Sequence, residues 1–258
     1  MRHLVLTIAI AFATLLTSCN FREIVLVGVE RNVVVQLKPF DNLVVRNATK
    51  LSVEYGDTFE YMFHADAAYL EYLTVEQDGL TLMFDSEYTF DELVLRVPRD
   101  YNFRTLKVNV SGASNLFFKS IPSEVETLEL GISGAGCLMI AETDSMELLD
   151  IKISGASKAE IDNTYCEKVN CLASGASKLN LFDGEIKSAG ICLSGASETT
   201  IVSGVDNVKF DISGASHLSL KDVRNAIDGT ATGASRVNYN GMPAIRNINT
   251  SGAASITN

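Results

Sequence analysis

The sequence predicts an all-β fold, a single-stranded parallel β-helix (β-solenoid) with coils of about 20 residues and a less regular N-terminal cap. Three observations predict it. The tetrapeptide Ser-Gly-Ala-Ser, or a close variant, occurs eight times. Apolar and polar residues alternate on both sides of each copy, which is typical of half-buried strands. The repeats also lack the periodicity of a helix.

The eight copies set the length of a coil. Successive copies lie 22, 21, 20, 20, 19, 19 and 19 residues apart, beginning at Ser111, Ser133, Ser154, Ser174, Ser194, Ser213, Thr232 and Ser251. A fixed period of this length indicates stacked units that bury their apolar faces only against each other. Leucine-rich repeats have a similar length, but their Leu-x-x-Leu-x-Leu skeleton is absent, and a β-propeller blade needs about twice the period.

Each coil is predicted to contain a strand, a corner, a second strand and a return segment of about ten residues. Before the motif, alternation such as Ile151-Lys152-Ile153 predicts the first strand, and after it Leu179-Asn180-Leu181 is typical of the second. Equivalent strands of neighbouring coils are then expected to pair about 4.8 Å apart.

The motif itself predicts the corner. Glycine, which allows a sharp bend or a close backbone approach, holds its second position in every copy: Gly112, Gly134, Gly155, Gly175, Gly195, Gly214, Gly233 and Gly252. Alanine holds the third position and predicts a tight site where stacked methyl groups fit and nothing larger does. The flanking hydroxyls are expected to bond to the bent backbone or to each other. The alternative is a flat hydroxyl array that binds ice or sugar.

Residues 1–18 are predicted to be a lipoprotein signal peptide. Arg2 precedes an apolar stretch from Leu4 to Leu16, and small residues lead to Cys19. The stretch is too short to span a bilayer. The site resembles the bacterial lipoprotein signal, which implies lipidation of Cys19 and a membrane partner reached through the lipid anchor. Asn20 instead of Asp implies the outer membrane, on a side left open. An ordinary cleaved signal peptide is the alternative.

Residues 19–35 are predicted to be the lipidated N-terminus and lead-in, and residues 36–258 the solenoid domain. Turn formers at Lys38-Pro39, Gly56-Asp57, Asp78-Gly79 and Pro98 divide the region before the first copy. The predicted strands of this region are Glu23–Val29, Asn32–Leu37, Leu43–Val45, Leu51–Tyr55, Tyr61–Phe63, Leu73–Val75, Leu80–Phe84 and Leu93–Val97. They are expected to run directly into the solenoid as its cap and first coils.

Three sequence segments and the repeated motif resemble those of a known protein family. Phe40-Asp41-Asn42-Leu43-Val44-Val45, Leu51–Asp57 and Leu73–Leu82, followed by the Ser-Gly-Ala-Ser units, resemble the putative auto-transporter adhesin, head GIN domain family. The resemblance covers roughly residues 36 to 258. It implies a lipoprotein or secreted protein of Bacteroidetes with a role in adhesion, and it brings no catalytic residues.

Composition and motif searches favour a non-catalytic protein. A net charge of -11 is wrong for nucleic-acid binding, which needs clustered Lys and Arg. No paired acids, phosphate loop or metal-binding spacing occurs, so we predict no catalytic residues, cofactor or metal. The spacing of the four cysteines after Cys19 fits neither a redox motif nor a zinc site. They are interpreted as free, small hydrophobic residues.

The sequence therefore predicts a non-catalytic cell-envelope lipoprotein that presents a solenoid surface for adhesion or scaffolding. Its expected ligand is a glycan or a protein surface. The first alternative is a carbohydrate-active enzyme on the same fold, similar to a polysaccharide lyase. The second is a structural envelope component without a ligand. Exposed terminal strands would also invite end-to-end or edge-mediated self-association.

Overall fold

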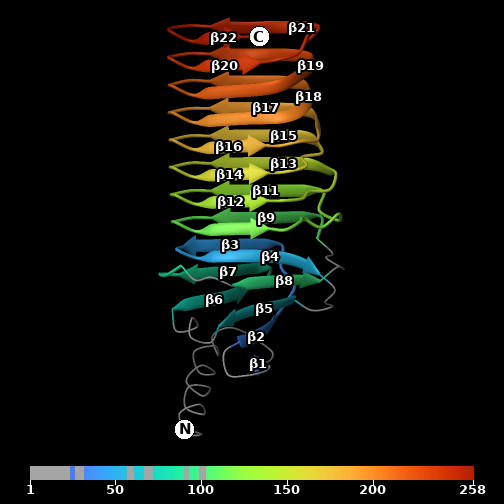
Figure 1. Ribbon diagram of the computed structural model, residues 1–258, viewed down its shortest axis with the longest axis vertical. Helices are drawn as coiled ribbons and strands as arrows, with labels where there is room; N and C mark the ends of the chain where they lie inside the picture. Colours follow the sequence, from blue (N-terminus) through green and yellow to red (C-terminus); the bar gives the residue numbers. More distant parts are fainter. Residues whose placement is uncertain (1–23, 27–31, 57–60, 67–71, 90–92, 99–102) are drawn as a thin grey trace.

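The computed structural model describes residues 24–26, 32–56, 61–66, 72–89, 93–98 and 103–258. This part of the chain contains strands and turns but no helix, and it forms one long stack of coils (Figure 1). The predicted all-β solenoid is thereby confirmed. The predicted signal peptide and the lipidation site at Cys19 lie outside the described residues, as do residues 20–23 and 27–31 of the lead-in.

Each coil contributes one strand to each of two parallel sheets. The strands before the corners form the first sheet, called here the pre-corner sheet: β3 (Asn42–Asn47), β9 (Thr105–Val110), β11 (Thr127–Ile132), β13 (Met146–Ile153), β15 (Cys166–Ala173), β17 (Glu185–Leu193), the later parts of β18 (Glu198–Ile212) and β19 (His217–Ala231), and β21 (Ile245–Thr250).

The strands after the corners form the post-corner sheet. It contains β4 (Lys50–Gly56), β10 (Asn115–Phe118), β12 (Cys137–Ile140), β14 (Lys158–Ile161), β16 (Lys178–Leu181), the first parts of β18 and β19, β20 (Arg236–Tyr239) and β22 (Ser255–Thr257). Equivalent repeat positions pair along both sheets, so each position stacks on its equivalent one coil away. In β18 and β19 the return segment is itself part of the strand.

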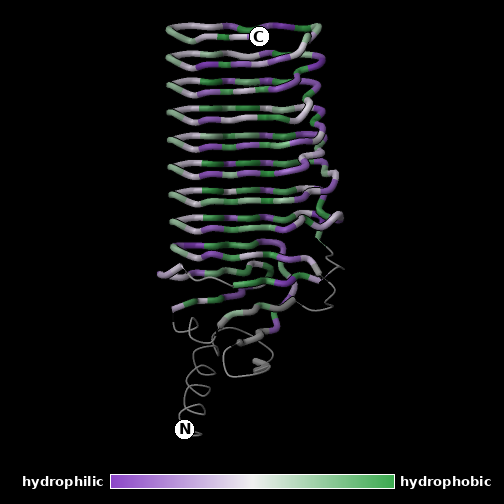
Figure 2. The backbone as a smooth tube through the Cα atoms, in the orientation of Figure 1, coloured by the Kyte–Doolittle hydropathy of each residue, from purple (hydrophilic) through white to green (hydrophobic). Residues whose placement is uncertain are grey.

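The core lies between the two sheets, and its side chains form rows along the stack. One row on the pre-corner sheet is almost fully buried and consists of Leu106, Leu128, Leu149, Val169, Ala189, Val208 and Ile227. Figure 2 shows hydrophobic and hydrophilic residues alternating along the coils. Burial of each large side chain contributes about 1.5 to 3 kcal/mol. A Cβ on Gly229 would lie 2.7 Å from Cγ of Phe210, so the Phe210 ring occupies the space that this glycine leaves.

The first coil of the chain is not the first coil of the stack. On one side β3 and β4 pair with β9 and β10 of the repeat region. On the other side they pair in parallel with β7 (Thr81–Ser86) and β8 (Val94–Pro98), which come later in the chain. The coil of residues 42–56 is therefore inserted between two later coils, an order that the sequence analysis did not predict.

Antiparallel strands close the end of the stack next to β7 and β8. There β6 (Leu73–Asp78) pairs with β7, β5 (Tyr61–Asp66) with β8, β2 (Asn32–Leu37) with β5 and β1 (Ile24–Leu26) with β2. Each of the eight strands predicted for this region has a counterpart among the described residues. The first of them is described only at Ile24–Leu26. Their pairing differs from the like-on-like stacking of the repeats, and this gives the molecule the irregular cap that the sequence predicts.

Candidate functional site

The structure places all eight predicted corner glycines at positive φ, between 72° and 75°. Each corner also stacks closely on the one before it. A Cβ on Gly175 would lie 2.6 Å from the carbonyl oxygen of Gly155, and the other corners are similarly crowded by backbone atoms. Both the backbone conformation and the close approach therefore require glycine.

Hydrogen bonds between coils continue through the corner. In successive coils the alanine N–H donates to the preceding glycine carbonyl, as Ala176 does to Gly155 at 2.7 Å. The serine at the fourth position is buried, and the Ser157 hydroxyl donates to the Ser154 carbonyl at 2.7 Å. The Ser177 and Ser235 hydroxyls are buried without a partner. Most of the hydroxyls at this position thus stabilise the bend through a hydrogen bond to its backbone, as expected.

The alanines do not occupy the tight site that the sequence analysis expected. The third position is exposed in every copy, from Ala113 to Ala253. The crowding lies one residue earlier, at glycine, and one residue later, at the buried serine. The corner therefore presents a regular outer edge of methyl groups at the strand spacing of about 4.8 Å.

A ninth corner precedes the eight copies, and the sequence analysis missed it. Asn47 lies at φ 61° between Arg46 and Ala48, in the place of the glycine. Thr49 replaces the last serine, and its hydroxyl donates to the Arg46 carbonyl at 2.8 Å, as Ser114 does to Ser111. Asparagine is among the few residues that adopt this conformation readily. The sequence feature that could have predicted this corner is the combination of Asn, Ala and a hydroxyl residue directly after the alternating segment of β3.

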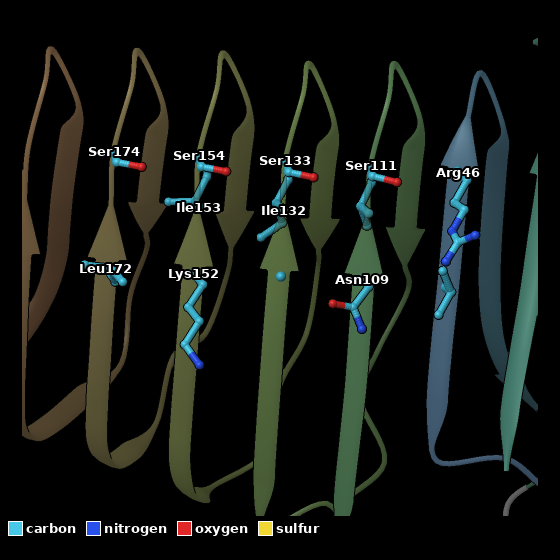
Figure 3. A pocket seen from close by; sticks show the side chains of 13 residues that line it. Arg46, Asn109, Ser111, Ile132, Ser133, Lys152, Ile153, Ser154, Leu172 and Ser174 are labelled. Atoms are coloured by element: carbon cyan, nitrogen blue, oxygen red, sulfur yellow. The ribbon is translucent and has the colours of Figure 1, made fainter.

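Beside these corners a shallow groove of about 450 Å³ crosses the outer face of the pre-corner sheet. It extends over β3, β9, β11, β13 and β15 and therefore runs across five coils. Gly131 of β11 has no side chain and lies at the floor of the groove, between its register partners Asn109 and Lys152. Figure 3 shows Asn109 and Lys152 on the strands on either side of the one that carries Ile132. The first-position hydroxyls form a row along the groove, and Figure 3 shows them pointing the same way: Ser111, Ser133, Ser154 and Ser174.

The groove is lined by both polar and apolar residues, with Arg46 at one end and Lys152 near the other. Arg46 is exposed beside its register neighbour Asp85, whose carboxylate accepts a hydrogen bond from the Asn47 amide. Lys152 lies 3.5 Å from the Asp150 carboxylate. Leu172 adds an apolar surface that is 52% exposed. The lining residues therefore offer hydroxyl, amide and cationic groups, but no carboxylate.

The outer face of the post-corner sheet carries surface ion pairs. Lys158 lies 2.9 Å from Glu160, and the Asn180 amide donates to the same carboxylate at 3.1 Å. The hydrogen bond from Lys158 lowers the pKa of Glu160. Among the described residues no group of three or more His, Cys, Asp or Glu side chains could hold a metal ion.

The four cysteines of the repeat region are free. Cys171 is buried, and desolvation raises the pKa of its thiol to about 12. Cys192 follows one coil later and is exposed, so the two thiols lie on opposite faces of the pre-corner sheet, as the alternation predicts. In the part of the chain that the structure describes, there is also no helix with the length and apolar character needed to cross a membrane.

Solved structures with the same fold come from Parabacteroides species. A putative adhesin from Parabacteroides merdae has 14% identity and a TM-score of 0.72, with 88% of this chain and 94% of that chain covered. One from Parabacteroides distasonis has 13% identity and a TM-score of 0.74, with 88% and 96% covered. A putative lipid binding protein from the latter species has 13% identity and a TM-score of 0.65, with 88% and 95% covered.

A search among curated proteins found no match. Residues 39–243, which are most of the chain, match the family described as putative auto-transporter adhesin, head GIN domain. This match includes the coil with the Asn47 corner, the groove and seven of the eight predicted corner glycines. The chain therefore belongs to the putative auto-transporter adhesin, head GIN domain family.

Proposed function

We propose that this protein is a non-catalytic, lipid-anchored envelope protein that uses its solenoid surface for adhesion or scaffolding. The contact site is the groove above Gly131. One observation carries the proposal: equivalent polar groups from successive coils line the groove at the spacing of the strands.

The groove favours an extended ligand that crosses the coils, such as a glycan chain or an extended protein segment. Four of the five coils supply one hydroxyl each in the same orientation, and Asn109 and Lys152 add stronger hydrogen-bonding groups. Because the corners fix the backbone beneath these groups, little conformational entropy is lost on binding. Several weak contacts along one ligand then add up.

The same groove argues against the carbohydrate-active enzyme that the sequence left as an alternative. Glycoside hydrolysis typically uses two carboxyl groups that face one bond, and a lyase on this fold needs an Arg or Lys base beside acidic calcium ligands. No residue that lines the groove carries a carboxyl group. The hydroxyls, amide and cations of the groove serve binding better than acid–base chemistry.

The lipid anchor would hold the molecule by its capped end. Cys19 precedes Ile24 of β1 by five residues, which span at most about 18 Å. Strand β1 lies at the end of the stack opposite β21 and β22 (Figure 1). An anchored molecule would therefore present its repeat coils, and the groove, outward from the membrane surface.

Substitution of the groove floor tests the site. A side chain at Gly131 would meet the movable end of the Asn109 side chain, so Gly131→Gln should fill the groove without unfolding the coil. Gly190→Gln is the matched control on the same sheet, because a Cβ there meets only ordinary contacts outside this groove. We expect binding to glycan arrays or host-matrix proteins to fall at least tenfold for Gly131→Gln alone.

Two results would contradict the proposal. Equal loss of binding in both variants would show that the groove is not the site. No binding of the wild-type protein to either kind of surface would favour the structural envelope component without a ligand.

A further inference from the structure

The last coil departs from the apolar pattern of the core. The buried row that runs from Leu106 to Ile227 continues in β21 with Arg246, which is the register partner of Ile227. The row that contains Ile153 and Ile212 ends in Thr250, the partner of Ala231. Two inward rows of the pre-corner sheet thus become polar in their final coil.

Arg246 covers the core with its charged group still exposed. Its Cζ atom lies 5.5 Å from the ring centroid of Tyr239, a distance typical of a cation–π contact. Tyr239 is only 2% exposed and belongs to the preceding coil. The Arg246 side chain therefore lies over the open end of the core, against the aromatic ring beneath it.

The strands of this coil would otherwise be open to pairing. On one side β21 and β22 bond to β19 and β20, and no described strand pairs with their other side. Neither strand contains a proline or an acidic residue, although such residues commonly prevent an edge strand from pairing with another chain. An inward-pointing charge also prevents such pairing, and Arg246 is the one charged residue in these two strands.

We infer that Arg246 is a capping residue that prevents a second copy of this chain from stacking on the last coil. Stacking would place its guanidinium in a continuous apolar row with no acidic residue between 241 and 258 to pair with it. Burial of an unpaired charge strongly opposes association. The inference concerns the end of the solenoid and is independent of the proposed groove function.

Sedimentation velocity of the purified full chain tests the cap. Arg246→Val restores the apolar row, and Arg236→Val is the control because it removes an exposed arginine from the outer face of β20. We expect the wild type and Arg236→Val to sediment as single copies. Arg246→Val should associate at least tenfold more tightly, whereas Arg246→Lys, which keeps the charge, should not.

Folding is checked by circular dichroism, and Arg246→Gln replaces Arg246→Val if the latter does not fold. A folded, uncharged variant that stays a single copy overturns the inference. So does a wild type that associates as tightly as Arg246→Val, a result that would support the self-association expected from the sequence.

Discussion

A corner residue of this solenoid must meet two demands, a positive φ and room for the coil beside it. Gly175 faces both, since a Cβ would approach the Gly155 backbone. At Asn47 the main demand is the positive φ. The strand on its far side, β7, ends at Ser86, the register partner of Asn47, and the described residues 87–89 that follow contain no Gly-Ala corner. A side chain is therefore tolerated at the first corner, where its amide also binds Asp85.

The tight corner predicts a large effect of even one methyl group. Gly175→Ala should lower the free energy of unfolding by about 3 kcal/mol, because backbone strain and a contact with a carbonyl oxygen act together. Gly190→Ala is the control, since Gly190 has no positive φ and its Cβ would meet ordinary contacts. Chemical denaturation measures both variants. Equal stability of the two would contradict the role assigned to the corner.

At the scale of elements, alternation was sufficient to predict the strands but not all of their partners. A period of two defines which face of a strand is buried. In the repeats the constant spacing also defines the neighbour, so the pairing of β11 with β13 follows from the sequence. The segments before residue 105 lack that spacing. Their order, with β3 between β7 and β9, depends on connections that no local pattern encodes.

The candidate site was hidden for a related reason. Gly131 occupies an outward position where the other coils have Asn109, Lys152 or Leu172, and the alternation treats all four alike. A groove forms only because one member of the row lacks a side chain between longer neighbours. The Ser-Gly-Ala-Ser motif predicts where the hydroxyls lie, whereas the groove beside them depends on one residue of the outward row, Gly131, that has no side chain.

Engineered disulfides test the order of the inserted coil. Val44 and Asn109 are register partners in β3 and β9, so cysteines at these positions should be about 5 Å apart and able to form a disulfide. Met83 lies one strand further away, opposite Val44. The pair Met83→Cys with Asn109→Cys should therefore stay reduced. Mass spectrometry after mild oxidation distinguishes the pairs, and the opposite result would contradict the order β7, β3, β9.

At the scale of the whole molecule, the two ends of the stack differ. The nine strands of the pre-corner sheet continue through β7 and β6 at the capped end, which makes eleven described strands in a row. At about 4.8 Å between neighbouring strands, this row is about 48 Å long. Antiparallel strands close one end, near the predicted anchor. The coil with Arg246 closes the other. Such a molecule is suited to a role in which one end is fixed and the side of the stack makes contacts.

Lipidation of Cys19 is the remaining condition for this arrangement. Cells grown with labelled fatty acid should yield labelled protein in the membrane fraction, and Cys19→Ser should abolish the label, because that thiol is the predicted acceptor. Cys192→Ser is the matched control, since Cys192 is the exposed thiol of the repeats and could accept a lipid by itself. Its label should equal that of the wild type. Label that persists in Cys19→Ser, or a wild type without label, would remove the anchor and leave adhesion to depend on secretion or another attachment.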